Sequence, residues 1–343
     1  MMKEIRVAVA IPVHNKERHI ARTLDSVLAQ SRTPDEILVV DDCSSDGSMV
    51  VVGSYADPRI RTFRREEPGP GGYAARNLAI EASDCDWIAF LDADDSWRPD
   101  HLEGLTQALA RAAQDGHAPV SAFSGYRFVS GDRAVPDWYS AAHTGPRTLS
   151  TEDLLSAWLS GGCPFWTGAV MIRRDSLLRT GMFPAGLCRR GGDRDLWLRT
   201  MLDGPSAFSG RASADYHQDA DNMLTRVETF STRQRVLTTL ENRIPRATGR
   251  RRTLLEAIFN REVFKYAQRA WAAGQPVTPA MLGGFRPARS PLKFVKIQAM
   301  RLLPLPRDAA RRGKLKGTLR RIRPGARARR RAAVDRMHGR PGA

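Results

Sequence analysis

The stretch that decides the fold is Trp87–Asp95, which reads WIAFLDADD in one-letter code. Its first five residues, Trp87–Leu91, form an uninterrupted apolar run of the kind found in strands that are buried on both faces. The run ends in the cluster Asp92, Ala93, Asp94 and Asp95. The sequence therefore predicts a buried strand that delivers three carboxylates to one edge of a sheet.

The residues before this stretch alternate between strand and helix patterns. Strands are predicted at 7–12, 36–40 and 59–64, and helices at 20–28, from 48 onward and at 73–82. Such alternation with short connections is typical of the α/β class, in which helices cover both faces of a mostly parallel sheet. Ligands of these sheets bind beyond the carboxyl ends of the strands. Asp41 and Asp42 follow the second strand, so we expect them to face the same crevice as the cluster.

The rest of the chain is less regular. The sequence predicts a helix from Pro99 to about residue 113, a strand at 121–129, a loop at 131–145, a helix at 151–159 capped by Thr151, a strand at 168–173, and helices at 193–201, 229–242 and 254–272.

The acidic cluster allows four interpretations. In the first, the carboxylates form a solvated turn that caps the helix beginning near Pro99, which is a common role for Asp. A calcium loop is the second, and it fails because Trp97 stands where the sharp turn requires glycine. The third is a dinucleotide fold, since Gly69–Ala74 matches the glycine pattern. It fails because Glu66 and Glu67 would repel a pyrophosphate there.

The fourth interpretation is a divalent cation that holds a diphosphate. The side chains of Asp92 and Asp94 can converge once the chain turns at the end of the strand, and would then ligate Mg²⁺ or Mn²⁺ that shares phosphate oxygens. A cation in that place neutralises the charge that develops on a departing diphosphate. The cluster alone leaves the first and fourth interpretations open.

Four motifs in a fixed order distinguish between the solvated turn and the metal–diphosphate site. They are Ile11–Asn15 (IPVHN), Val39–Ser48 (VVDDCSSDGS), Ala74–Asn77 (AARN) and Trp87–Asp95. Together with Gly192–Trp197 (GDRDLW), they closely resemble the motifs of family 2 glycosyltransferases with the GT-A fold, over roughly residues 5–225. Because several ordered motifs are far more specific than one, the resemblance favours the metal–diphosphate interpretation.

The resemblance implies roles for individual residues. The nucleotide-sugar site would contain Pro12, Val13, His14, Asp42, Arg76, Asp92, Ala93 and Asp94. Asp92 and Asp94, with Asp95 beside them, would hold the divalent metal, Mn²⁺ or Mg²⁺. For Arg76 the structural alternative is an ion pair with Glu81 or Asp92.

The resemblance also implies a general base for an inverting transfer. That base takes the proton of the acceptor hydroxyl on the side of the sugar opposite the leaving diphosphate. Asp193 matches the family's base, although Gly192 stands where relatives usually carry Glu. Asp195 is the alternative, and its position in the first turn of a helix gives it a structural explanation. His217 is a further candidate for a phosphate or metal contact, or else a structural histidine.

The charge of the chain is concentrated at its C-terminal end. Residues 285–343 hold 19 Lys and Arg against two acidic residues, whereas the remaining residues hold 35 of each sign. This predicts three regions: a GT-A domain at 1–225 (nucleotide-binding half about 1–115, acceptor half about 116–225), a helical extension at 226–284 and a basic tail at 285–343.

The basic tail predicts an anionic partner. It lacks the interleaved aromatic residues that stack on bases, so we expect no nucleic acid partner. Apolar residues at 294–305 lie among Lys293, Lys296 and Arg301, a mixture that suits an amphipathic segment on an anionic membrane. A solvated, partly disordered tail is the alternative.

The sequence thus predicts an inverting glycosyltransferase. Its donor would be a nucleotide-diphosphate sugar, with UDP favoured, and its acceptor a hydroxyl of a glycan, a lipid-linked saccharide or a small molecule such as a secondary metabolite. The alternative is a catalytically silent GT-A-like protein that docks on a membrane or polyanion through its tail. Without a signal-peptide pattern or an apolar run of about 18–20 residues, the expected location is the cytoplasm, peripheral on the inner face of the membrane.

Overall fold

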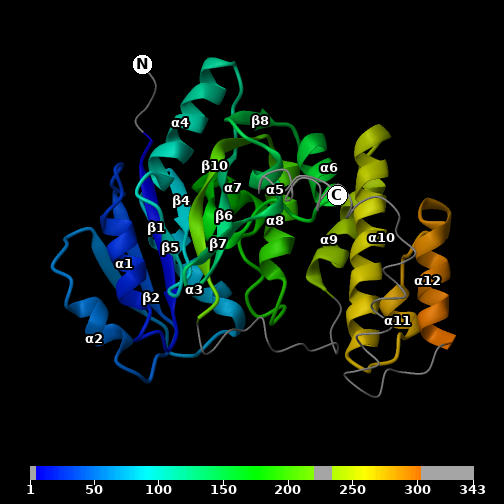
Figure 1. Ribbon diagram of the computed structural model, residues 1–343, viewed down its shortest axis with the longest axis horizontal. Coiled ribbons are helices and arrows are strands. Elements are labelled where there is room, and N and C mark those ends of the chain that lie inside the picture. The colour runs from blue at the N-terminus through cyan, green and yellow to red at the C-terminus, as the bar shows by residue number, and fades with distance from the viewer. Residues whose placement is uncertain (1–4, 220–233, 303–343) are drawn as a thin grey trace, which may run out of the picture. The chain divides into compact units, whose positions relative to one another are not determined.

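The computed structural model describes residues 5–219 and 234–302 (Figure 1). The chain divides into two compact units, Met1–Arg261 and Glu262–Ala343. The first unit carries the sheet, and the described part of the second unit is helical. The helix predicted at 229–242 begins outside the described residues, and its described part is α9, Arg235–Arg243.

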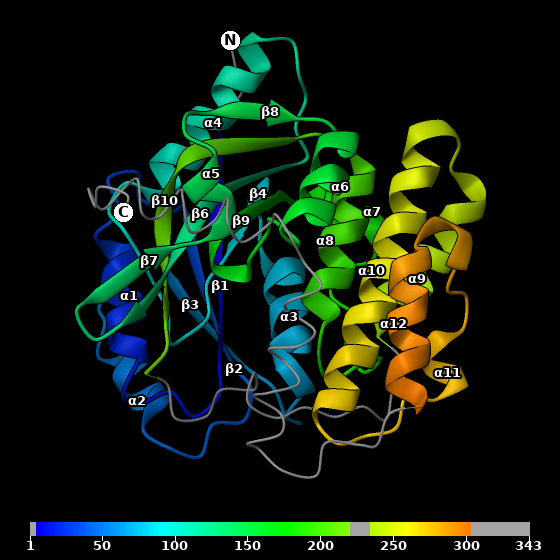
Figure 2. The ribbon, with the colours of Figure 1, turned by 45° about the vertical axis from the view of Figure 1, so that its right-hand side comes forward.

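The first half of the sheet is parallel. Its strands are β1 (Val7–Val13), β2 (Glu36–Asp41), β3 (Ile60–Arg64) and β4 (Trp87–Phe90), connected through the helices α1 (Ile20–Leu28), α2 (Ser48–Gly53) and α3 (Tyr73–Ala82). β1 pairs with β2 and β4, and β2 pairs with β3. β2 and β4 are buried along their whole length. Figure 2 shows α1 and α2 on one face of this half of the sheet and α3 on the other, where Phe90 of β4 also contacts Phe183 and Trp197. This half agrees with the prediction almost residue by residue.

The second half of the sheet is mixed. Its strands are β5 (Ser96–Trp97), β6 (Ser121–Ser130), β7 (Arg133–Pro136), β8 (Arg147–Leu149), β9 (Val170–Arg173) and β10 (Ser206–His217). Across the described residues the sheet order is β3-β2-β1-β4-β9-β6-β10-β5, with β7 beside β6 and β8 beside β10. β9 runs antiparallel to both of its neighbours, whereas β6 and β10 are parallel. The predicted α/β class with flanking helices is confirmed.

Six helices of the first unit accompany this half. They are α4 (His101–Gln114), α5 (Trp138–Ala142), α6 (Thr151–Ser160), α7 (Arg174–Thr180), α8 (Gly192–Asp203) and α9. α5 and β7 lie inside the segment that the sequence predicts as a loop, 131–145, because Asp137 caps α5 through the Tyr139 and Ser140 N–H groups. The cap of α6 is Ser150, in a reciprocal pair with Asp153, rather than the predicted Thr151.

A buried histidine fixes α4 to β10. The ring of His101 stacks on Trp97 with 4.5 Å between centroids, and its Nδ1 lies 2.9 Å from Ser213 Oγ. Among the described residues its Nε2 has no hydrogen-bond partner. Burial lowers the pKa of His101 to about 3, so the ring is neutral at neutral pH.

The second unit contains the end of α10 (Gly249–Ala272), α11 (Pro279–Leu282) and α12 (Pro291–Leu302). Its core is an apolar cluster of Ala267, Trp271, Val277, Ile297 and Met300. The region that the sequence assigns to the basic tail therefore begins with an ordered helix. Of the helices within the described residues, none combines the length and the hydropathy that a membrane crossing requires.

Candidate active site

The carboxyl ends of β1 and β2 lie side by side and form the first part of the site. The Asp42 N–H donates to the Val13 carbonyl oxygen at 2.7 Å, and His14 Nδ1–H donates to the Asp42 carbonyl oxygen at 2.7 Å. Asn15 has a φ of 52°, which is uncommon without glycine, and its Oδ1 accepts a hydrogen bond from the Ser45 N–H at 2.8 Å. The segment predicted to contact the nucleotide is thereby held against Asp42.

The Asp42 carboxylate lies beside a small cavity. It accepts hydrogen bonds from the Arg65 guanidinium and from the Gly69 N–H, the latter at 3.1 Å, and the residue is 3% exposed. The cavity has a volume of about 180 Å³ and is lined by Arg65, Glu67, Pro68, Gly69, Pro70, Ala74, Ala185 and Gly186. A fixed carboxylate next to such a hollow provides an acceptor for the N–H or hydroxyl groups of a ligand.

At the end of β4, cationic side chains pair with two of the three carboxylates that were predicted to bind metal, Asp92 and Asp94. The Arg76 guanidinium pairs with Asp92, and Lys16 Nζ lies 2.7 Å from Asp94 Oδ2. Ala93, between the two, is buried in the core. The predicted residues Arg76, Asp92 and Asp94 are thus brought together, and the Arg76–Asp92 pair is the one named as the structural alternative. Lys16 joins them as a contact that the sequence did not predict.

Arg22 connects the cluster to the end of β10. Its Nη2 donates to the Asp94 carbonyl oxygen at 2.6 Å, and both of its Nη atoms bond to Asp219, at 2.8 and 3.1 Å. The hydrogen bonds from Arg22 lower the pKa of Asp219 to about 2. Asp219 therefore remains an anion and neutralises Arg22.

Asp95, the third carboxylate of the cluster, is buried in the protein. The residue is 1% exposed, its Oδ1 accepts the His217 N–H at 2.9 Å, and its Oδ2 has no partner among the described residues. Burial and the charges of Asp94 and Asp92 raise the pKa of Asp95 well above its usual range. Asp95 therefore ties the cluster to β10.

His217 lies close to the cluster as well. Its Nε2 lies 2.8 Å from Ser96 Oγ. Burial, followed by the charge of Arg22, lowers the pKa of His217, so the ring is neutral at neutral pH. A neutral imidazole here matches both alternatives drawn from the sequence, a ligand contact and a structural role.

One turn of α3 links the cluster to Asp193. Arg76 contacts Asp92, and three residues earlier Tyr73 Oη accepts the Gly192 N–H at 2.9 Å. Tyr73 is buried, and its burial and the charge of Asp193 raise its pKa. The hydroxyl therefore stays protonated beside that carboxylate.

Asp193 and Asp195 differ in what surrounds them. Asp195 is 1% exposed, and its carboxylate accepts hydrogen bonds from Arg199 Nε at 3.0 Å and from Thr239 Oγ1 at 2.5 Å. Asp193 is half-buried and accepts no hydrogen bond from any residue in the described ranges. Asp195 is thus engaged in joining α8 to α9, whereas no hydrogen bond from the described residues engages the Asp193 carboxylate.

The carboxylates of the cluster are the kind of group that hard divalent cations prefer. Asp92 and Asp94 each bond through one oxygen to a cationic side chain of the protein, and among the described residues their second oxygens accept no hydrogen bond. Within residues 5–219 and 234–302, no three His, Cys, Asp or Glu side chains form a metal site by themselves. Two carboxylates suit a Mg²⁺ or Mn²⁺ ion that takes its remaining ligands from water and a diphosphate. The residues therefore fit a metal that binds together with its nucleotide.

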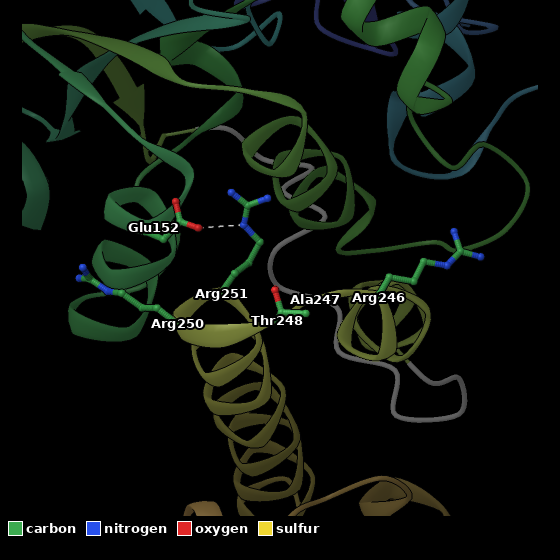
Figure 3. A pocket seen from close by; sticks show the side chains of 6 residues that line it. All are labelled: Glu152, Arg246, Ala247, Thr248, Arg250 and Arg251. Atoms are coloured by element: carbon green, nitrogen blue, oxygen red, sulfur yellow. Dashed lines mark hydrogen bonds and ion pairs between the residues drawn. The ribbon is translucent and has the colours of Figure 1, made fainter.

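A second hollow of the first unit shares no residue with this site. Its volume is about 320 Å³, and its lining is Glu152, Arg246, Ala247, Thr248, Arg250 and Arg251 (Figure 3). Arg251 bonds to Glu152 at 2.9 Å, whereas Arg246 and Arg250 point in opposite directions. Because the cationic groups diverge, we assign no function to this hollow.

The sequence did not predict four residues that make contacts in the site: Lys16, Arg22, Arg65 and Tyr73. Three of them are among 54 Lys and Arg in the chain, and their partners are remote in sequence, so no local pattern distinguishes them. Tyr73 directly precedes the AARN motif, and this position is the only sequence feature that could have indicated a role for it in the site.

The comparisons with known proteins agree with this geometry. Residues 8–178 match the profile of "Glycosyl transferase family 2". The putative teichuronic acid biosynthesis glycosyltransferase TuaG of Bacillus subtilis is 31% identical over 204 residues, 59% of this chain and 74% of TuaG. The Escherichia coli UDP-Glc:alpha-D-GlcNAc-diphosphoundecaprenol beta-1,3-glucosyltransferase WfgD is 37% identical over 102 residues, 30% of this chain and 40% of WfgD.

Solved structures show the same fold. S. aureus TarS 1–349 in complex with UDP-GlcNAc superposes with a TM-score of 0.67 at 18% sequence identity, covering 86% of this chain and 84% of TarS. The family match and the relatives identify the chain as a sugar-transferring enzyme. The chain belongs to glycosyltransferase family 2, with the GT-A fold. Enzymes of this class generally use a divalent metal.

Proposed function

We propose that this glycosyltransferase inverts the configuration of the sugar that it transfers from a UDP-sugar to a hydroxyl acceptor. The observation that carries the proposal is the turn of α3 that contacts Asp92 through Arg76 and Gly192 through Tyr73. It connects an acidic, cation-lined diphosphate site to a separate carboxylate with no partner among the described residues. An inverting transfer needs both groups, one on each side of the sugar.

The donor would lie along the strand ends. Pro12, Val13, His14 and Asp42 would contact the base and ribose, since Asp42 bonds to Arg65 and Gly69 of the cavity lining and to Val13 and His14. The diphosphate would lie against Arg76 and Lys16, and Asp92, Ala93 and Asp94 would form the adjoining wall. UDP is favoured because TarS was solved with UDP-GlcNAc, and WfgD is named for a UDP-glucose donor.

Asp193 would act as the general base. It would accept the proton of the acceptor hydroxyl while that oxygen attacks the anomeric carbon and the bond to the diphosphate breaks. Arg76 and Lys16 would hold the negative charge of the departing diphosphate. A Mn²⁺ or Mg²⁺ ion on Asp92 and Asp94 would supply further charge neutralisation when bound. Asp95 would keep its structural link to His217.

The acceptor we propose is a lipid-linked saccharide at an anionic membrane surface. WfgD is named for an acceptor on diphosphoundecaprenol, and TuaG for teichuronic acid, a polymer made of sugars. The net charge of +17, concentrated in residues 285–343, would favour an anionic membrane surface on the side where nucleotide sugars are made. The enzyme would then work at the cytoplasmic face.

The experiment is UDP release from a panel of UDP-sugars with Mn²⁺, with and without a lipid diphosphate-linked sugar as acceptor. Asp94→Asn should abolish turnover and weaken Mn²⁺-dependent UDP binding, whereas Asp193→Asn should abolish turnover and leave UDP binding intact. An equal loss of UDP binding in both variants would contradict the two roles. Turnover at the wild-type rate in Asp193→Asn would overturn the proposed base.

A further inference from the structure

The second unit has a helix with two apolar faces. In α12, Ile297 and Met300 are buried in the cluster with Ala267, Trp271 and Val277. Packing within the second unit accounts for this face. It does not account for the apolar residues on the rest of the helix.

The other apolar face is exposed. Leu292, Val295 and Leu302 are 78%, 64% and 86% exposed, and Ala299 between them is exposed as well. Positions 292, 295, 299 and 302 are three, four and three residues apart, the spacing of side chains that share one face of an α-helix. Four apolar side chains along the length of α12 thus face away from the core of this unit.

The same helix carries positive charge without any negative charge. Pro291–Leu302 contains Lys293, Lys296 and Arg301 and no acidic residue. Lys296 follows Val295 directly and lies next to the exposed face. Residues 285–343 together hold 17 more cationic than anionic side chains. Charge complementarity therefore requires an anionic partner, and an aqueous polyanion would leave the apolar face uncovered.

We propose that the face Leu292, Val295, Ala299 and Leu302 docks on the surface of an anionic phospholipid bilayer. The apolar side chains would enter the boundary between headgroups and acyl chains, and the Lys and Arg side chains would contact phosphates, as in helices that lie in the plane of a membrane. This surface extends the proposed function, because it would hold the enzyme where a lipid-linked acceptor is found. Docking itself requires no donor, no metal and no turnover.

The test is co-sedimentation of the full chain with vesicles, at physiological salt and without donor. One set contains phosphatidylglycerol and phosphatidylcholine, and the other phosphatidylcholine alone. The variant is Leu292→Ser/Val295→Ser/Leu302→Ser, and its matched control is Val50→Ser/Val135→Ser/Leu178→Ser, which changes three exposed apolar residues of the first unit. Because all six side chains are exposed, both variants should fold, which circular dichroism verifies.

We expect wild type and control to sediment with the anionic vesicles, and the α12 variant to partition at least tenfold more weakly. Equal sedimentation of the α12 variant and wild type would overturn the proposal, since the cationic tail alone would then account for binding. The proposal would also be overturned if wild type did not sediment with vesicles. A change of oligomeric state in the α12 variant, measured by analytical ultracentrifugation, would then show that the face binds a second copy of the chain. Vesicle binding by Asp193→Asn, which should equal that of wild type, separates this inference from the proposed reaction.

Discussion

Tyr73 Oη accepts a hydrogen bond from the Gly192 N–H at 2.9 Å, and the space for a side chain at residue 192 is already filled by the ring of Tyr73. A Cβ on Gly192 would lie 2.9 Å from that ring and 2.8 Å from Pro184 Cγ. The ring itself stacks on Phe183, with 5.9 Å between centroids. A larger side chain such as Glu cannot fit beside Tyr73 without a shift of these surrounding residues.

Gly192→Ala should therefore lower the stability of the first unit. Overpacking by one methyl group in a close-packed cluster costs about 1–3 kcal/mol. Chemical denaturation followed by circular dichroism measures the change. Gly53→Ala is the matched control, because a Cβ there meets no atom within 4 Å and alanine favours the helix. Equal stability of the two variants would show that residue 192 has more room than the structure gives it.

Tyr73→Phe should lower kcat and leave the KM for the donor unchanged. The variant keeps the ring and its stacking, but leaves the buried Gly192 N–H without an acceptor, at a cost of about 1–3 kcal/mol. The turn that presents Asp193 then loses its anchor. Steady-state kinetics with a varied donor separates the two constants. Tyr55→Phe, which removes a hydroxyl bonded to Asp25 at the surface, should leave both unchanged.

Stability should fall as the pH is lowered from 6.5 towards 3, because of His101. Its pKa is about 3 in the folded protein, below the ordinary value of 6.5, so over this range the unfolded chain binds a proton that the folded one excludes. The stabilisation is complete above pH 6.5 and is lost as the pH falls through the folded pKa. It amounts to about 1.4 kcal/mol for each unit of difference.

Thermal unfolding across this pH range measures the effect of His101. In His101→Gln the decline should be shallower, since the replacement does not titrate. His117→Gln, at an exposed histidine, should follow the wild-type curve. If the stability of all three proteins fell equally with pH, His101 would not be the cause of the decline.

Lys16→Met should strengthen the binding of Mn²⁺ to the protein in the presence of UDP. Lys16 Nζ lies 2.7 Å from Asp94 Oδ2, so a cation on that carboxylate meets the repulsion of the ammonium group. Isothermal titration calorimetry should show a Kd several-fold lower than in wild type, and Lys16→Arg, which keeps the charge, should resemble wild type. Weaker binding of Mn²⁺ in Lys16→Met would show that the contact of Lys16 with the diphosphate outweighs its repulsion of the metal.

The sequence predicts the parallel half of the sheet well because β1 and β4 are continuous apolar runs, and such runs have few alternatives to burial. It does not predict β10, SAFSGRASADYH, whose small and polar residues lack both a run and a clean alternation. That strand owes its conformation to pairing with β6 over most of its length. The short strands β5, β7 and β8 likewise depend on neighbours remote in sequence.

The candidate site also contains some residues that the sequence could predict and others that it could not. Asp42, Arg76, Asp92, Asp94 and Asp193 belong to motifs with fixed spacing, so the sequence could nominate them. The preference for Asp193 over Asp195 gains its physical reason only from the structure, because Thr239 and Arg199 engage Asp195. Lys16 and Arg22 reach the site through tertiary contacts. The sequence shows where the cationic residues are but not which carboxylate each of them pairs with.

The turn of α3 that joins Arg76 to Asp92 and Tyr73 to Gly192 also constrains how this enzyme can evolve. A large side chain at position 192 would require less bulk at Tyr73, and Phe183 would then lose its stacking partner. Substitutions at these three positions are therefore expected to occur together.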